Sequence, residues 1–490
     1  MTVDKKNIPL LKRQKTSKEN NMNNYADANP TKEFFINMLT RDIELSDAIL
    51  DLLDNCLDGV VRLKKDTDKK ADKKYYEGFN AGITITKDSF IIKDNCGGIS
   101  RTIAEKYAFR MGRGETGEAL PTVGMYGIGM KRAIFKIGKE AEVISQHADS
   151  SFSVKIPENW ANEKDWKFPI TEITKKVSTI KGTEIKITKL TEGVAKQWGN
   201  DNLLELFVND LKLKIQSSYS LIIEKGFNIS VNRKKIEPFP VELLISKEKK
   251  KNAIKPFIFE KKYGDVNVFL TVGFYAPPPT DDELDETAES KRSSSDAGWT
   301  VVCNDRVVVY NNKDHLTGWG EAGVPQYHTQ FIGIRGIVIF KSNVPGKLPM
   351  TTTKRGIDLS SPIYADIKNK MREGIKFFIS YTNQWKGRNE EERIHSKATE
   401  SVPYSSLFED SNLKKRGIKL QTKDGGSIFR PDLPKPQNDK DYEIIRFSRS
   451  KDDINVIRNH ICEDQSIEVK PSKVGEYCFD FVLKKVSGGK

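Results

Sequence analysis

The chain has 490 residues, of which 37% are hydrophobic and 30% are charged, and its formal net charge is +13 at pH 7. At about 100 to 200 residues per domain, this length predicts two to four domains with sizeable cores. No run approaches the roughly 18 apolar residues of a membrane span. The polar N-terminus also lacks the apolar core of a signal peptide, so we expect a cytoplasmic protein with no membrane partner.

Charge and cysteine content narrow the class of protein further. Five scattered cysteines with no Cys-x-x-Cys pair suggest neither a disulfide framework nor a zinc site. The positive charge is compatible with a nucleic-acid partner, although many basic proteins bind none. Residues 1–28 are polar, basic and without periodicity, which predicts a disordered tail.

The first strongly periodic stretch is residues 44–59, where apolar side chains recur at the spacing of an amphipathic helix. The opposite face carries polar side chains at Asp47, Asp51, Asn55 and Asp58. A solvated acidic face is the common explanation of such a pattern. The alternative is a row of carboxylates held beside a ligand, and the motifs that follow favour it.

A predicted β-hairpin ends in a glycine pair. Residues 82–86 and 89–93 are rich in β-forming residues and flank a Lys-Asp turn. The second strand leads directly into Asp94, and Gly97 and Gly98 follow shortly after. Glycines after a strand usually mark a turn, but next to an aspartate they also let a ligand approach the backbone while the carboxylate takes its polar edge.

A glycine-rich stretch precedes the next predicted helix. Gly124, Gly127 and Gly129 lead to Lys131 and a helical pattern that stops at Gly138. Free N–H groups at a helix start hold anions, and a nearby lysine adds to this. The spacing excludes a Walker A loop and a dinucleotide fingerprint, because the lysine and the third glycine are out of place. Further strands are predicted at 142–145, 152–156 and 183–187.

In this order, the motifs resemble those of the GHKL ATPases. The family includes MutL mismatch-repair proteins, Morc ATPases, type II topoisomerases, a class of heat-shock chaperones and histidine kinases. Its first motif, an acidic residue four before an asparagine and another three after it, matches Asp51, Asn55 and Asp58. Its second motif, Asp-x-Gly-x-Gly, matches Asp94 and Gly98.

Two further stretches carry the resemblance. The glycine-rich lid of the family, in its Morc form, matches residues 124–131, and the Gly-Thr of the last motif matches Gly182 and Thr183. The resemblance covers residues 30–190 and implies an ATP-binding domain over residues 29–195. It also implies the Bergerat fold for this domain, a two-layer α/β sandwich within an α+β protein.

The resemblance implies a role for each matching residue. Asp94 would accept the adenine amino group, and Gly98 and Thr183 would complete the pocket. Asn55 would bind Mg²⁺ through its amide oxygen, since this ion takes few protein oxygens beside phosphates and waters. Asp51 would orient or deprotonate the attacking water.

The lid residues would neutralise the phosphates of ATP. Gly127, Gly129 and Lys131 carry this role, and Gly124 begins the same loop. Closure of the lid over ATP is then expected to expose or order the surface of an ATP-dependent homodimer.

Two positions depart from the family pattern. Asp51 stands where most of these families have a glutamate, which shortens its reach by one methylene and predicts slow hydrolysis or a water relay. Cys96 stands where the first glycine of the second motif is usual, and its side chain is expected to narrow the adenine pocket.

Residues 196–388 are predicted to form a second, transducer-like α/β domain. Residues 301–310 predict two strands about an Asn-Asp turn, similar to a hairpin of the MutL transducer domain. An acidic insert, residues 277–298, is rich in serine and proline and is expected to be disordered. Helices are predicted at 202–217 and 362–385, and strands at 219–233, 266–275 and 331–340.

The loop at residues 349–357 resembles the transducer loop that reaches back to the γ-phosphate. The resemblance gives this catalytic contact to Lys354, with Lys347 as the fallback if the loop register differs. A surface lysine is the ordinary alternative, because most lysines are exposed.

The remainder gives less information. Residues 389–440 are polar and are predicted to form a linker, and residues 441–490 are predicted to form a small α/β module with a strand, a helix and a strand. His460 and Cys462 lack further residues at metal-ligand spacing, so no metal site is predicted there.

Three functions compete at this point. The first is a slow, ATP-gated dimer of MutL or Morc type that acts on nucleic acid or a partner protein, and bacterial relatives of this layout suggest host defence or DNA maintenance. The second is a nucleotide-sensing scaffold or chaperone-like module without significant hydrolysis. The third, a histidine kinase, is disfavoured because no histidine precedes the ATP site on a dimerising helix.

Overall fold

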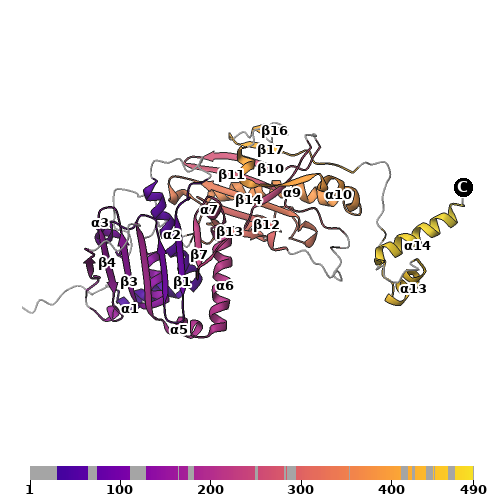
Figure 1. Ribbon diagram of the computed structural model, residues 1–490. Coiled ribbons are helices and arrows are strands. Elements are labelled where there is room, and N and C mark those ends of the chain that lie inside the picture. Colours follow the sequence, from indigo (N-terminus) through magenta and orange to yellow (C-terminus); the bar gives the residue numbers. More distant parts are fainter. Residues whose placement is uncertain are drawn as a thin grey trace, which may run out of the picture.

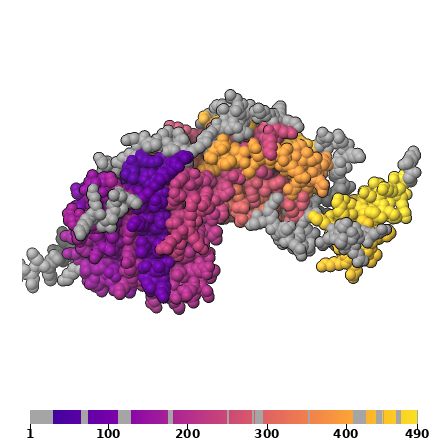
Figure 2. Space-filling view, in the orientation of Figure 1, coloured from indigo at the N-terminus to yellow at the C-terminus, as the bar shows by residue number. Residues whose placement is uncertain are grey.

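The computed structural model describes residues 30–64, 74–110, 128–163, 165–174, 181–248, 252–280, 283, 294–351, 354–409, 418–421, 425–436, 445, 447–461 and 469–488. Within these ranges the chain forms two α/β domains and a C-terminal pair of helices (Figure 1). The predicted tail, Gly124, Gly127 and most of the predicted insert 277–298 lie outside the described residues. Figure 2 shows the two domains in contact and the C-terminal helices as a separate mass beside the second domain.

The first domain is built on an eight-stranded sheet with the order β5-β4-β3-β6-β2-β1-β7-β8. Neighbouring strands are antiparallel except β1 and β7, which are parallel. The strands are β1 (Asn80–Ile85), β2 (Phe90–Asp94), β3 (Gly138–Gln146), β4 (Ser151–Ile156), β5 (Ile170–Glu172), β6 (Gly182–Leu190), β7 (Asn228–Val231) and β8 (Lys234–Lys235).

Helices pack on this sheet through apolar stripes. They are α1 (Lys32–Arg41), α2 (Leu45–Leu63), α3 (Arg101–Ile103), the π-helical turn Ala104–Ala108, α4 (Gly129–Ile137), α5 (Glu192–Trp198), α6 (Asp201–Ser218) and α7 (Ser220–Glu224). Ala48, Ile49, Leu52 and Leu53 of α2 are almost fully buried and share one core with the inner side chains of the strands. This confirms the predicted amphipathic helix and explains how α2 is held rigidly.

The second domain contains a seven-stranded sheet with the order β13-β12-β14-β11-β10-β17-β16. Its strands are β10 (Phe257–Tyr263), β11 (Val266–Phe274), β12 (Gly298–Cys303), β13 (Arg306–Asn312), β14 (Ile334–Lys341), β16 (Ile418–Gln421) and β17 (Ser427–Arg430). Helix α9 (Pro362–Gln384) packs on the sheet, and a Cβ on Gly374 would lie 2.5 Å from Val272, so the helix approaches β11 closely. The predicted β12–β13 hairpin is confirmed, with Asn304 and Asp305 in the left-handed region at its turn.

Smaller elements complete the chain. Strand β9 (Glu242–Ser246) pairs with β15 (Thr399–Pro403). In the sequence, β15 lies between α10 (Asn389–Lys397) and α11 (Tyr404–Glu409). Helices α13 (Lys451–Ile461) and α14 (Pro471–Val486) contact each other at the C-terminal side. Among the described residues, no helix has the length and apolarity that crossing a bilayer requires.

Three features differ from the sequence prediction. Strands β7 and β8 complete the first sheet, so the first domain extends to about residue 236 rather than 195. Residues 389–440 hold α10, β15, α11, β16 and β17 rather than a linker, and residues 220–224 form a helix instead of a strand. The described part of 441–490 is helical and shows no strand. Short apolar runs do not distinguish strand from helix, and pairing with distant strands decided each case.

Candidate functional site

Three acidic residues of α2 are buried rather than solvated. Asp51, Asp54 and Asp58 are 4%, 1% and 3% exposed. Carboxylates at this depth require partners, because an unpaired buried charge is costly. The ordinary explanation of the acidic pattern is therefore wrong for this helix, and its polar face is part of a built site.

Asp94 lies at the end of β2, where its Oδ1 atom accepts two backbone hydrogen bonds. The N–H of Cys96 donates at 2.7 Å and the N–H of Thr183 at 3.3 Å. Burial raises the pKa of Asp94, and these two N–H groups oppose that shift. A further donor to this carboxylate would favour its charged form.

Two glycines allow backbone segments to pack closely beside Asp94. Gly98 has a φ of +71°, and a Cβ there would overlap the carbonyl oxygen of Gln146. A Cβ on Gly182 would overlap the carbonyl oxygen of Asp94 itself. A side chain at Gly182 would push β6 and the Asp94 loop apart, and one at Gly98 would push this loop away from the end of β3. The structure thus brings Asp94, Gly98 and Thr183 together, as their motif spacing predicts.

Two buried cysteines lie beside Asp94. Cys56 of α2 and Cys96 are 5% and 2% exposed. Burial, reinforced by the negative charge of Asp94, raises the pKa of both thiols well above the ordinary value. They are therefore neutral at physiological pH and act as packing groups rather than nucleophiles. The narrowing effect of Cys96 stays a prediction.

Asn55 lies one helical turn after Asp51 on α2. Its amide nitrogen is buried and has no hydrogen-bond partner among the described residues. Buried amide nitrogens are almost always paired, so this NH2 group is available to donate to a ligand, whereas only the amide oxygen can bind a metal ion. The described residues contain no cluster of three or more His, Cys, Asp or Glu able to hold a metal ion. A single amide oxygen fits Mg²⁺, which takes most of its ligands from phosphates and water.

Helix α4 begins directly against Asp51. A Cβ on Gly129 would lie 3.4 Å from Asp51 Oδ2, at ordinary van der Waals distance, so the helix starts directly beside this carboxylate. Lys131, in the first turn, is 1% exposed and donates to the carbonyl of Ala108 at 2.9 Å. Burial lowers the pKa of Lys131 to about 8. The role of Lys131 and Gly129 at phosphates stays a prediction.

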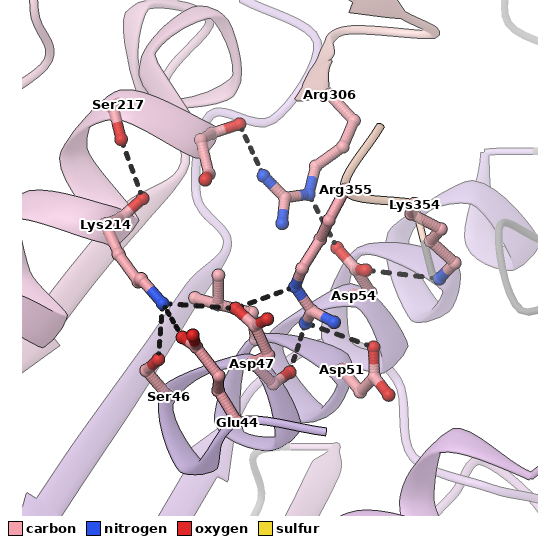
Figure 3. A network of polar contacts seen from close by, with 12 residues as sticks. Glu44, Ser46, Asp47, Asp51, Asp54, Lys214, Ser217, Arg306, Lys354 and Arg355 are labelled. Atoms are coloured by element: carbon pink, nitrogen blue, oxygen red, sulfur yellow. Dashed lines mark hydrogen bonds and ion pairs between the residues drawn. The ribbon is translucent and has the colours of Figure 1, made fainter. Parts of the chain in front are cut away.

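A loop of the second domain delivers two cations to α2 (Figure 3). Lys354 Nζ lies 3.2 Å from Asp54 Oδ2. Arg355 Nε lies 2.9 Å from Asp47 Oδ1, and its Nη2 lies 3.3 Å from Asp51 Oδ1. Their side chains are only 11% and 16% exposed, so Lys354 is no ordinary surface lysine.

Lys347, the fallback candidate, lies elsewhere. Its ammonium pairs with Asp265 at 2.5 Å, and both side chains are more than half exposed. Lys347 is therefore a solvent-facing residue of the second domain, and Lys354 is the lysine that reaches α2.

Several residues of this network were not predicted from the sequence. Asp54 accepts hydrogen bonds from Tyr219 at 2.9 Å and from Arg306 at 3.2 Å, besides its contact with Lys354. Burial alone would raise the pKa of Asp54, but the charges of Lys354 and Arg306 outweigh it and hold the pKa below its usual range. Arg306 begins β13 and is 3% exposed. Its partner lies 252 residues away in sequence, so no local pattern indicates it.

Asp51 has a second cationic partner within its own domain. Arg132 of α4 contacts Asp51 Oδ2 through its guanidinium. Its position next to Lys131 was the only available signal, since the lid motif leads directly into it. Arg132 and Arg355 thus approach Asp51 from the two domains.

A cavity of about 320 Å³ lies where the two domains meet. It is lined by Glu44, Asp47 and Leu50 of the first domain's α2 region, by Lys214 and Ser218 of α6, and by Arg306 to Tyr310 and Arg355 of the second domain. Nearby, Leu221 of α7 packs with Val302 and Val307 of the hairpin. The apolar contact fixes the hairpin, whereas the loop with Arg355 borders open space.

The comparison with known families agrees with this geometry. Residues 43–186 match the family model described as histidine kinase-, DNA gyrase B-, and HSP90-like ATPase. No curated protein matches the chain. The match confirms the GHKL resemblance of this segment, and the large sheet with its helices is compatible with the expected α/β sandwich.

Proposed function

We propose, from the GHKL-type ATPase domain at residues 43–186, that this protein is a slow, Mg²⁺-dependent ATPase whose second domain responds to the γ-phosphate. The domain type itself supports ATP binding. The observation that carries the rest is the pair of cations, Lys354 and Arg355, held on the acidic face of α2 from the second domain. A contact between the domains at this point links nucleotide chemistry to domain arrangement.

The residues divide the work between the two ends of ATP. Asp94 accepts a hydrogen bond from the adenine amino group. The N–H of Thr183 donates to Oδ1 of Asp94, and Gly98 has no side chain that would fill the adenine pocket. A base without this amino group cannot make the contact with the buried carboxylate, which gives selectivity. Asp51 orients the attacking water and accepts its proton. When bound, Mg²⁺ neutralises phosphate charge, and Asn55 would hold it through the amide oxygen.

The phosphates are bound by the start of α4 and by the second domain. Helix α4 begins at Gly129 beside Asp51, and the first N–H groups of a helix have no carbonyl partner within it. Lys131 adds charge if its ammonium turns from the Ala108 carbonyl, and Lys354 supplies the contact that distinguishes ATP from ADP. Gly124 and Gly127 belong to the same proposal and lie outside the described residues.

ATP-driven closure is proposed to produce a homodimer that acts on nucleic acid or a partner protein, in host defence or DNA maintenance. The basic net charge supports a polyanion partner. The alternative is a nucleotide-sensing scaffold or chaperone-like module that binds ATP without turning it over. Asp51 keeps this alternative open, because it is shorter than the family's usual glutamate.

Turnover separates the two functions. Asp51→Asn should keep ATP binding and lower turnover by about 10² to 10⁴, as expected for loss of a general base. Sedimentation with and without a non-hydrolysable ATP analogue, each repeated with DNA, measures the dimer and its partner. A wild-type protein that binds ATP but shows no turnover above the Asp51→Asn background supports the scaffold.

A further inference from the structure

Lys354 and Arg355 lie on a short loop whose described residues are tied to one another. The Met350–Ile357 bridge closes its ends, and Thr351 donates its N–H to Gly356 at 3.0 Å. Lys354 and Arg355 are adjacent within this loop. A displacement of one of them by several ångströms therefore displaces the other.

Both oxygens of Asp51 are engaged by guanidinium groups. Arg132 contacts Oδ2, and Arg355 lies 3.3 Å from Oδ1. A guanidinium beside each oxygen restricts the approach of a water molecule to this carboxylate. Arg132 belongs to the same domain as Asp51 and stays beside it, whereas Arg355 comes with the second domain. Departure of the loop would free Oδ1 alone.

Asp54 can lose Lys354 without becoming an unpaired buried charge. Tyr219 and Arg306 both bind its Oδ1 atom, while Lys354 binds Oδ2. Arg306 also donates to the carbonyl of Ser218 at 2.8 Å and stacks over the Tyr219 ring at 4.0 Å. The contact of Arg306 with Asp54 is thus fixed, whereas Lys354 can leave Asp54 for another anion.

We propose that Arg355 is a positioning residue that covers Oδ1 of Asp51, and that Asp54 competes with the terminal phosphate of ATP for Lys354. This inference rests on the proposed ATPase function. When the phosphate takes Lys354, Arg355 leaves Asp51 with it, and the cavity it borders gives its side chain room. One loop movement then both detects the terminal phosphate and uncovers the oxygen that accepts the proton.

The arrangement predicts that loss of Arg355 changes the affinity for one nucleotide and not for the other. When ATP binds, the loop must give up its contacts with α2, and this costs free energy. ADP binding carries no such cost, because ADP has no phosphate for Lys354. Arg355→Gln removes the contacts to Asp47 and Asp51, so it should tighten binding of a non-hydrolysable ATP analogue about tenfold, the factor for a contact of 1.4 kcal/mol. Its affinity for ADP should not change. Calorimetric titration of the full chain measures both.

A conservative variant and a matched control accompany this test. Arg355→Lys should give an intermediate shift, because an ammonium reaches one carboxylate but cannot span two. Lys347→Gln removes a cation from the same domain whose partner, Asp265, lies in solvent, and should leave both affinities at wild-type values. The lysine variant also serves if Arg355→Gln does not fold.

The possible outcomes distinguish failure of this inference from failure of the proposed ATPase function. Tighter analogue binding with unchanged ADP binding supports the inference. Equal weakening of both nucleotides shows a merely structural role for Arg355 and overturns it, as does no change in either. If wild-type protein binds neither nucleotide, the proposed function itself fails.

Discussion

At the scale of single residues, Asp94 offers the sharpest test of nucleotide recognition. In Asp94→Asn, the amide oxygen would keep the two bonds from Cys96 and Thr183, and the amide nitrogen would occupy the other position. A donor there faces the adenine amino group, which is also a donor. We expect ATP affinity to fall by at least the 1.5 to 3 kcal/mol of a charged hydrogen bond, about 10- to 150-fold.

Titration of ATP into this variant by calorimetry measures the loss. Asp88→Asn, in the exposed turn between β1 and β2, is the control and should bind ATP normally. Unchanged affinity in Asp94→Asn would remove this carboxylate from the adenine pocket.

Lys131 predicts a pH dependence of stability. Its pKa in the fold is about 8, against an ordinary value of 10.5, so the unfolded chain binds more protons between these values. The free energy of unfolding contributed by this site is therefore lowest below pH 8 and rises with pH through that window. At about 1.4 kcal/mol per unit, the rise should reach about 1 to 3 kcal/mol.

Urea unfolding of wild type and Lys131→Met at about pH 7 and about pH 10 measures the contribution of Lys131 to the free energy of unfolding. The methionine variant cannot titrate, so wild type should gain stability relative to it as the pH rises. A constant difference between the two proteins would show that Lys131 carries its charge in the fold without penalty.

At the scale of elements, the start of β6 depends on one glycine. A Cβ on Gly182 would overlap the Asp94 carbonyl, so Gly182→Ala must displace either β6 or the Asp94 loop. We expect loss of ATP binding and destabilisation by roughly 1 to 3 kcal/mol, as for overpacked cores. Gly193→Ala in α5 is the control, because no atom lies within 4 Å of the added carbon.

The control should be neutral or stabilising by up to about 1 kcal/mol, since alanine favours a helix. Thermal unfolding and nucleotide titration of both variants give the comparison. If Gly182→Ala unfolds and binds like wild type, the close passage of β6 over Asp94 is not a requirement of the site.

Sequence patterns predicted the elements that local chemistry determines. The apolar stripe indicated α2, and the Asn-Asp turn indicated the β12–β13 hairpin, whose two turn residues have positive φ. The pairing of β7 with β1 follows from a long-range choice of strand partner that no window of sequence contains. The same limit hid Arg355, whose contact with Asp51 spans 304 residues.

At the scale of the whole molecule, the proposed function has Lys354 couple the second domain to ATP. Lys354→Ala should bind ADP normally and lose the ATP-dependent dimer. The loss of ATP affinity should be smaller than the roughly 1.5 to 3 kcal/mol of a charge-assisted contact, because the variant also loses the competing contact with Asp54. Sedimentation with an ATP analogue measures the dimer, and Lys347→Ala is the control. Normal dimerisation of Lys354→Ala would contradict the coupling.

The strand order of the first domain bears on how the protein is made. As the chain leaves the ribosome, β1 and the strands that flank Asp94 emerge well before β7, because α5, α6 and α7 lie between them. Until β7 arrives, β1 is an open edge able to pair with other chains. The nascent protein therefore carries Asp94 and its neighbours for an interval without a closed sheet, and chaperone protection at this stage would limit aggregation.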